Sequence, residues 1–515
     1  MKTKFSILFL LISFFSFSQI EEKKLDELIQ NTLKTFDVPG ISVGIIKDGK
    51  IVYSKGFGVR SLTTNQQMTD ETLVGIASNS KGFTATALAI LADEGKLNFD
   101  DKVSKYIPEF QMNDAYVSQE VTIRDLITHR AGLGLGQGDL MFFPDGGTQT
   151  IKDIIHNVRY LKPENSFRST LDYNNVMFIV AGEVITRVSG LSWADFIEQR
   201  IMKPVGMTSS YGSYNHAKTA NVSNIIDAHA PVNGKAIAIP HDWNETANAA
   251  GGIVSNIKDM NIWAEFLMNG FTTKDGKKLV TDKQIFQLWN LQIATPVALK
   301  NPYDSNFNGY GLGWFLTDVK GHKQVYHTGG LIGTVTQFTL IPDMKLGIVV
   351  LTNQQSGAAF TTITNTIKDA YLGIEDRNWL KINGDKNTKK NEEYEKGKKE
   401  IFVKSEAFKK DRKVQIKNEQ ILGTYNDNWF GDVILSKEGN TLRISCKTSP
   451  RLKGELLPYS PNVMIAKWDD RSYDADVFVN FQFDENGKAL GMTFKPISDI
   501  TDFSFDFEDL DLKKK

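Results

Sequence analysis

The sequence predicts an α+β protein made of a large domain of helices and antiparallel strands and a small all-β domain. Up to Trp379, helical patterns alternate with strand patterns and hairpin signals. From Gln420 onward, short alternating segments recur between turn signals such as Glu485-Asn486-Gly487. A chain of 515 residues has room for one large and one small domain.

The composition is that of a globular protein. Hydrophobic residues make up 41% and charged residues 23% of the chain, which excludes wholesale disorder. Lys and Arg number 60 against 61 Asp and Glu, for a net charge of -1. There is no basic excess to neutralise phosphates, so we expect no nucleic-acid partner.

Cysteine and histidine usage argues against disulfides and metals. Cys446 is the single cysteine, and a buried free thiol is its expected state. The seven histidines form no HxH or HExxH pattern, so we expect no metal site and no cofactor. His129 is expected to make a structural hydrogen bond.

Residues 1–18 are predicted to be a secretory signal peptide. A basic head, Met1 to Lys4, precedes an apolar run from Phe5 to Phe17, and Ser16 and Ser18 supply small residues for cleavage. A buried N-terminal helix or strand is the alternative. Since a membrane span needs about 20 residues, we expect no span in the mature chain and an exported, periplasmic or extracellular protein.

The large domain is predicted over residues 19–378. Helices are expected at 21–36, 82–93, 121–128, 176–185, 193–202, 256–268 and 361–371, and strands at 41–46, 51–53, 335–341 and 346–351. The first two strands form a hairpin, because Asp48-Gly49 supplies the positive φ of a tight turn.

A charged linker is predicted over residues 379–418 and the small all-β domain over residues 419–512. Residues 386–400 are nearly all Lys, Glu and Asn, typical of a solvated linker or an exposed helix. Strands are expected at 433–435, 442–445, 463–467, 477–483 and 490–494 and through Phe503, Phe505 and Phe507, as in a small sandwich or barrel.

Ser78 and Lys81 are the first candidate catalytic pair. They lie three residues apart at the start of an Ala-rich helix, and so share one helical face. A lysine held in a dry pocket loses its charge and can take the proton of a serine nucleophile. The same spacing recurs at Ser255 and Lys258, where an ordinary capped helix is the better interpretation; for Ser78 the alternative is a plain N-cap.

Tyr173 and Asn175 form a second motif. A phenol near Lys81 can serve as phenolate, or share a proton with the lysine, as a general base. Asn175 can hydrogen-bond both Lys81 and a substrate carbonyl. Taken alone, this motif is better interpreted as a turn before the apolar helix that follows, with Asn as the helix cap.

His327-Thr328-Gly329-Gly330 forms a third motif at the entry to a strand region. Glycines at a strand edge leave the backbone open to an extended substrate, and the Gly330 N–H can complete an oxyanion hole with that of Ser78. The alternative is a simple glycine turn between strands.

The three motifs together, in this order, resemble the serine β-lactamase and penicillin-binding protein superfamily, and look most like its class C β-lactamase branch with the related esterases and D-amino-acid peptidases. The similarity covers about residues 21–373 and includes segments 95–108, 123–133, 251–260 and 310–314. The C-terminal region resembles, less specifically, a lipocalin-like domain attached to some members.

The resemblance implies a fold and a mechanism. An antiparallel sheet flanked by helices carries a mostly helical inserted region, with the site between them. Ser78 forms an acyl-enzyme, Tyr173 with Lys81 moves the protons, and the Ser78 and Gly330 N–H groups hold the oxyanion. Asn175 and Thr328 orient the substrate.

One departure bears on specificity, because His327 replaces the lysine that the family carries there. A neutral histidine pairs weakly with a carboxylate. We therefore expect a small-molecule or peptide substrate, with cell-wall fragments among the candidates, cleaved at an ester, amide or D-amino-acid peptide bond. The alternatives are a β-lactamase or DD-carboxypeptidase, a non-hydrolytic penicillin- or peptidoglycan-binding sensor, and an interaction protein with a vestigial site whose C-terminal domain builds homo-oligomers.

Overall fold

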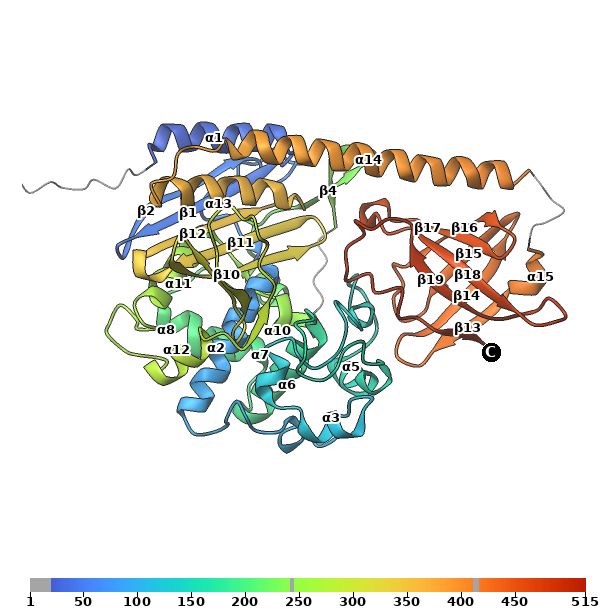
Figure 1. Cartoon of the computed structure of the whole chain (residues 1–515), viewed down its shortest axis with the longest axis horizontal. Helices are drawn as coiled ribbons and strands as arrows, with labels where there is room; N and C mark the ends of the chain where they lie inside the picture. The colour runs from blue at the N-terminus through green and yellow to red at the C-terminus, as the bar shows by residue number, and fades with distance from the viewer. Residues whose placement is uncertain (1–19, 241–244, 411–415) are drawn as a thin grey trace, which may run out of the picture.

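The computed structural model describes residues 20–240, 245–410 and 416–515. The predicted signal peptide, residues 1–18, lies outside the described residues. Figure 1 shows a large α+β domain beside a C-terminal β-barrel, with one long helix, α14, running along both.

An eight-stranded antiparallel sheet forms the centre of the large domain. Its order is β2 (Lys50–Gly58), β1 (Gly40–Lys47), β12 (Leu346–Thr352), β11 (Thr334–Ile341), β10 (His322–Leu331), β9 (Phe315–Val319), β8 (Asn308–Tyr310) and β7 (Ile293–Thr295). Asp48 and Gly49 have φ values of 52° and 71° in the turn between β1 and β2, as the sequence predicts.

Helices cover both faces of this sheet. α1 (Glu22–Thr35) and α13 (Gly357–Tyr371) lie on one face, and α11 (Ile257–Met268) lies on the other (Figure 1). Within β12, Ile348 and Val350 pack in the core on the first face, whereas Val349 and Leu351 pack in the core on the second. Successive strand residues point to opposite faces, so one apolar strand fills both cores.

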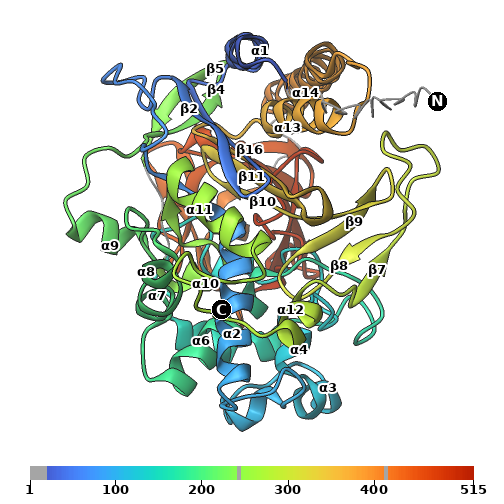
Figure 2. The same ribbon diagram turned by 90° about the vertical axis from the view of Figure 1, so that its left-hand side faces the viewer.

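A mostly helical region is inserted between α2 (Ser80–Asp93) and the later strands. Figure 2 shows α2 running below the sheet, between α6 and α10 on one side and α12 on the other. The inserted helices are α3 (Ala115–Glu120), α4 (Ile123–Leu126), α5 (Ile151–Asn157), α6 (Asn175–Ser189), α7 (Trp193–Ile197), α8 (Lys203–Val205), α9 (Tyr214–Thr219), α10 (Asn248–Gly251) and α12 (Asp282–Leu288). Two small antiparallel sheets accompany them: β3 (Val74–Gly75) pairs with the distant β6 (Val254–Ser255), and β4 (Ala228–Val232) forms a hairpin with β5 (Lys235–Ile239).

Two predicted helices differ from those observed. The helix expected over 121–128 is the four-residue α4, because Thr122 caps it in an extended conformation and His129, at φ 56°, turns the chain after it. The helix expected over 193–202 is α7 continued by a π-helical turn over Glu198–Met202.

The charged segment that begins at Trp379 forms a helix, α14 (Trp379–Phe408). Of the two predictions for this segment, a solvated linker or an exposed helix, the structure has the helix. Both of its ends are held by packing. The Trp379 indole donates a hydrogen bond to Asp369 (2.7 Å) in the large domain, and Ser405 donates one to the Pro458 carbonyl (2.8 Å) in the barrel. Tertiary contacts therefore stabilise a segment whose composition alone is also compatible with a loose linker.

The C-terminal domain is a closed antiparallel barrel. Its strands are β13 (Gly423–Asp427), β14 (Gly431–Glu438), β15 (Thr441–Cys446), β16 (Lys453–Ser460), β17 (Val463–Trp468), β18 (Val477–Phe483), β19 (Ala489–Pro496) and β20 (Leu512–Lys514), preceded by the short helix α15 (Asn418–Ile421). Cys446 is a buried free thiol in β15, as expected.

The strand predicted through Phe503, Phe505 and Phe507 is wrong. These residues lie in the loop between β19 and β20. The Ser504 N–H donates to the Asp502 carboxylate (2.9 Å), and this side-chain turn bends the backbone away from an extended path. Phe505 and Phe507 pack in the barrel core, whereas Phe503 is 42% exposed and faces the large domain.

No single helix within the described ranges is long and apolar enough to cross a membrane. Two consecutive helical segments, α6 and Trp193–Val205, are long and apolar enough only when they are taken together, and the chain bends by 72° between them.

Candidate active site

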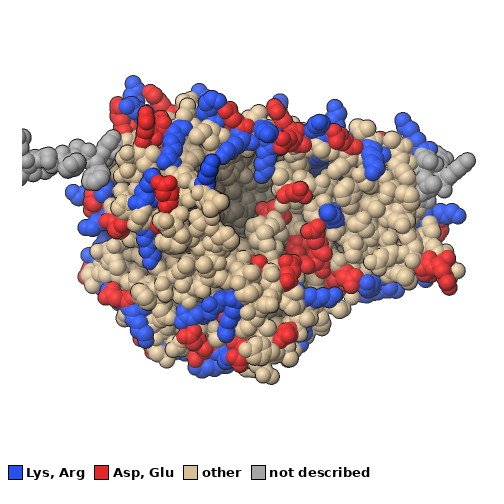
Figure 3. Space-filling view, viewed as in Figure 1, with Lys and Arg blue, Asp and Glu red and all other residues tan. Residues whose placement is uncertain are grey.

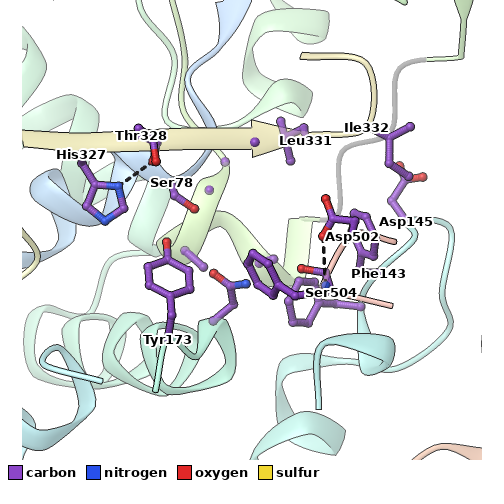
Figure 4. Close-up of a pocket in the computed structure, with 18 of the residues that line it drawn as sticks. Ser78, Phe143, Asp145, Tyr173, His327, Thr328, Leu331, Ile332, Asp502 and Ser504 are labelled. Carbon is purple, nitrogen blue, oxygen red and sulfur yellow. Dashed lines mark hydrogen bonds between the residues drawn. The ribbon is translucent and has the colours of Figure 1, made fainter. Parts of the chain in front are cut away.

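Ser78 lies on a strained turn between the sheet and the inserted helices. Ala77 has φ 49°, a left-handed conformation unusual for alanine, and begins the 3-10 turn Ala77–Asn79 that leads into α2. Thr336 of β11 fixes this turn, because its hydroxyl donates to the Ile76 carbonyl (2.9 Å) and accepts from Asn79 Nδ2 (2.8 Å). The turn presents Ser78 to a pocket at the end of β10 (Figure 4).

Lys81 is fully buried one turn after Ser78. Its Nζ lies 3.0 Å from Ser78 Oγ and donates to Asn175 Oδ1 (2.7 Å) and to the Ala250 carbonyl (2.9 Å). Burial lowers the pKa of Lys81 to about 7, against a smaller opposing effect of the Asp139 charge. A neutral amine that donates its two N–H groups to these oxygens directs its lone pair at the Ser78 hydroxyl.

Tyr173 immediately precedes the residues that cap α6, and its hydroxyl points up toward Ser78 (Figure 4). Burial raises its pKa well above the ordinary value, and a hydrogen bond with Ser78 partly offsets this rise. The ring packs against His129 at 4.2 Å between centroids, and Lys81 Nζ lies 4.8 Å from its centroid. The phenol is therefore protonated in the resting protein, and Lys81 is the stronger candidate for the first base.

His129 supports this arrangement through the backbone. Its Nδ1 accepts a hydrogen bond from the Asn174 N–H (3.0 Å), and burial lowers its pKa well below the ordinary value. The imidazole is neutral and has the structural role expected from the sequence.

Asn175, the first residue of α6, connects Lys81 to a carboxyl group that the sequence motifs do not include. Its Oδ1 accepts from Lys81, and its Nδ2 donates to Asp139 Oδ2 (2.7 Å). Asp139 follows a Gln-Gly dipeptide in an irregular segment, where no spacing rule marks it. Only the packing of that segment against α6 places it beside the motif.

His327 is held in the sheet by both ring nitrogens. Nδ1 donates to the Thr328 carbonyl (2.6 Å), and Nε2 accepts from the Tyr310 hydroxyl (2.9 Å). Burial, with the Lys81 charge nearby, lowers the pKa of His327 to about 3. The position where the family carries a lysine thus holds a neutral ring with no free donor.

The rest of the third motif divides into two roles. Thr328 and Gly330 line the pocket with Ser78, Tyr173 and Asn175. Gly329 does not line it, because this residue faces the turn before Ser78. A Cβ on Gly329 would lie 2.3 Å from the Ile76 carbonyl oxygen and 2.6 Å from Thr336 Oγ1. Its lack of a side chain therefore allows β10 to approach the Ser78 turn.

The barrel supplies part of the pocket wall, which sequence reasoning missed. The cavity has a volume of about 320 Å³, and Asp502, Phe503 and Ser504 line it beside the motif residues. Figure 4 shows Asp502 and Ser504 at the side of the pocket opposite His327. The Phe503 ring lies edge-on to Tyr173 at 6.0 Å between centroids. The remaining lining is mainly apolar, from Leu135, Phe142, Phe143, Phe315, Leu331 and Ile332.

The charged groups in the pocket wall are carboxylates. Asp145 and Asp502 line it, and it contains no Lys or Arg among the described residues. Gly330, Leu331 and Asp502 also border a second cavity between the domains. The molecular surface is hollowed there below α14, with Asp and Glu side chains gathered beside the hollow (Figure 3). Within the described ranges, no group of three or more His, Cys, Asp or Glu residues could hold a metal ion.

Solved structures share this fold. A penicillin-binding protein homologue from Pyrococcus abyssi, described as octameric, superposes with a TM-score of 0.60 over 92% of this chain and 98% of that chain, at 22% identity. A class C β-lactamase from Rhodobacter sphaeroides gives a TM-score of 0.54 over 68% of this chain and 100% of that chain, at 19% identity.

The chain belongs to the β-lactamase family, whose sequence model matches residues 25–371, and its fold is that of serine hydrolases. Residues 417–514, which contain the barrel, match a domain of unknown function, DUF3471.

Curated relatives include an unguisins hydrolase of Aspergillus campestris, 27% identical over 363 residues and 68% of this chain. Another is protein flp of Staphylococcus aureus strain N315, 27% identical over 340 residues and 65% of this chain. The matches span 65% and 64% of those relatives' own lengths.

Gly329→Ala should destabilise the protein by about 1–3 kcal/mol, because the new Cβ overlaps backbone that cannot move away cheaply. Gly330→Ala is the matched control, since a Cβ there meets nothing within 4 Å. Urea unfolding of both variants measures the difference, and equal stabilities would show that β10 does not need this close approach.

Proposed function

We propose that the protein is an exported serine hydrolase that cleaves ester, amide or D-amino-acid peptide bonds through an acyl-enzyme on Ser78. The observation that carries the proposal is the buried Lys81 amine, 3.0 Å from Ser78 Oγ with its other polar contacts taken by oxygens.

In the first half-reaction, the Ser78 hydroxyl attacks the substrate carbonyl carbon while its proton moves to Lys81. The backbone N–H groups of Ser78 and Gly330 stabilise the oxyanion, and one such donor contributes about 3 kcal/mol. Tyr173, which contacts both Ser78 and Lys81, relays the proton to the leaving group. In the second half-reaction, a water molecule gives a proton to the same groups and attacks the acyl-enzyme carbonyl carbon. The bond between that carbon and Ser78 Oγ then breaks, and the proton returns to Oγ as the acid product leaves.

The specificity follows from charge. A substrate carboxylate would meet the neutral His327 ring and would find no Lys or Arg in the described pocket wall, where Asp502 lies and where Asp145 is already paired with Arg451 Nη1 (3.0 Å). This environment favours neutral or amine-bearing substrates with apolar groups over β-lactams and peptides that end in a free carboxylate.

Ser78→Ala should lower hydrolysis of an aryl ester by at least about a thousandfold and abolish labelling by a fluorescent fluorophosphonate. Ser255→Ala, at the other S-x-x-K sequence, is the matched control and should leave labelling intact. Persistent labelling of the Ser78 variant would place the nucleophile elsewhere.

An aryl ester should be turned over with a larger kcat/KM than nitrocefin, because nitrocefin carries a carboxylate that the pocket does not pair. Steady-state kinetics on the purified mature protein make the comparison. A strong preference for nitrocefin would support a β-lactamase, and a single burst without turnover would support a penicillin-binding sensor.

We also propose export and self-association. The basic head and apolar run at the N-terminus support cleavage before Gln19, and the description of the Pyrococcus abyssi homologue as octameric supports a homo-oligomer. The intact mass of the exported protein should correspond to a chain starting at Gln19, and light scattering should give more than one subunit. An uncleaved or cytoplasmic product, or a monomer, would contradict the respective proposal.

A further inference from the structure

A buried carboxyl group that the proposed mechanism does not use lies beside the catalytic groups. Asp139 begins the 3-10 turn Asp139–Met141, and its side chain is buried. Its Oδ2 accepts hydrogen bonds from Asn175 Nδ2 (2.7 Å) and from Ser504 Oγ (2.8 Å). Its Oδ1 has no hydrogen-bond partner among the described residues.

These bonds form a continuous bridge from the barrel to the proposed base. Ser504 belongs to the loop between β19 and β20, Asp139 to the inserted region, Asn175 to α6 and Lys81 to α2. The same loop is anchored by a second contact, because the Gly138 N–H donates to the Asp506 carboxylate. The loop is therefore docked on Asp139 and on the residue that precedes it.

Several charges face Asp139. Lys81 attracts its negative charge from α2, whereas Asp502 of the barrel loop repels it. Asp506, in the same loop, and the Tyr173 phenol are also influenced by the Asp139 charge. Burial raises the pKa of Asp139, and the hydrogen bonds from Asn175 and Ser504 partly offset that rise by stabilising the carboxylate.

We propose that Asp139 is a positioning residue of the acyl-transfer site and that Ser504 makes its action depend on the docked barrel domain. Asp139 holds the Asn175 amide with its N–H₂ turned away from Lys81 and its carbonyl toward the amine. It also places a negative charge where Lys81 becomes positive as it takes the Ser78 proton. The inference rests on the proposed function of Ser78.

The physical reason lies in the asymmetry of an amide. Asn175 has one acceptor and one donor group, and a flip of the amide would set its N–H₂ against the Lys81 N–H groups. A carboxylate accepts hydrogen bonds only, so it fixes the orientation in which the donor faces Asp139. Ser504 keeps the carboxylate in place and favours its ionised form.

Asp139→Asn, which keeps the shape of the side chain, is the direct test. With an aryl ester as substrate, kcat should fall about tenfold to a hundredfold because the base loses its alignment, while KM should stay within about twofold. Without the negative charge, Lys81 loses its proton more easily, so the rising limb of the pH–kcat profile should move to lower pH.

Ser504→Ala tests the role of the barrel. It should lower kcat by about threefold to tenfold and, like Asp139→Asn, move the rising limb of the pH–kcat profile to lower pH. Ser449→Ala is its matched control, because Ser449 is a buried barrel serine whose hydroxyl has no hydrogen-bond partner among the described residues. That control should keep the wild-type kcat and pH profile. If circular dichroism shows that Asp139→Asn does not fold, the kcat and pH profile of Ser504→Ala, compared with those of Ser449→Ala, decide whether Asp139 positions the base.

The possible outcomes separate this inference from the proposed function. The wild-type protein could be labelled at Ser78 and turn over the ester while Asp139→Asn and Ser504→Ala keep the wild-type kcat and pH profile. That result would overturn the positioning role alone. A wild-type protein that shows no labelling at Ser78 would overturn the proposed function itself. A lower kcat without a shift of the pH limb would mean a merely structural role and would also overturn the inference.

Discussion

The burial of one amine is the constraint on which the site depends. Lys81 is enclosed by α2, α6 and the Ala250 backbone, and desolvation removes the preference of its side chain for the charged form. An enclosed amine needs acceptor atoms for its N–H groups, since an unpaired buried donor is costly. The protein supplies them with one amide oxygen and one backbone carbonyl, so the remaining direction, toward Ser78, is left for proton transfer.

The barrel is part of this enclosure rather than a separate appendage. Its β19–β20 loop brings Phe503 against Tyr173 and Ser504 against Asp139. Other loops of the barrel also contact the large domain through their backbone carbonyls: Thr448 accepts a hydrogen bond from the Thr148 N–H (2.8 Å), and Trp429 accepts one from Gln149 Nε2 (3.0 Å). The docked barrel therefore helps to set the shape of the pocket.

His327, at the position where the family carries a lysine, is held in place by its neighbours in the sheet. Tyr310 and the Thr328 carbonyl use both ring nitrogens, and the imidazole is packed among aromatic rings from Tyr173, Tyr310 and Phe315. A charged group there would lose both hydration and partners. The neutral ring and the acidic pocket wall thus act together on substrate charge.

The sequence by itself determined the α+β class, the hairpin at Asp48-Gly49, the free Cys446 and the family, because these depend on local periodicity, turn chemistry and motif order. The short spacing from Ser78 to Lys81 already fixed their shared helical face. Tertiary structure alone decided that the segment after Trp379 is a helix, that Phe503 leaves the barrel to face Tyr173, and that Asp139 meets Asn175. Asp139 also meets Ser504, which lies 365 positions further along the chain. No local preference of the chain encodes such a contact, since it arises only when separately folded surfaces pack together.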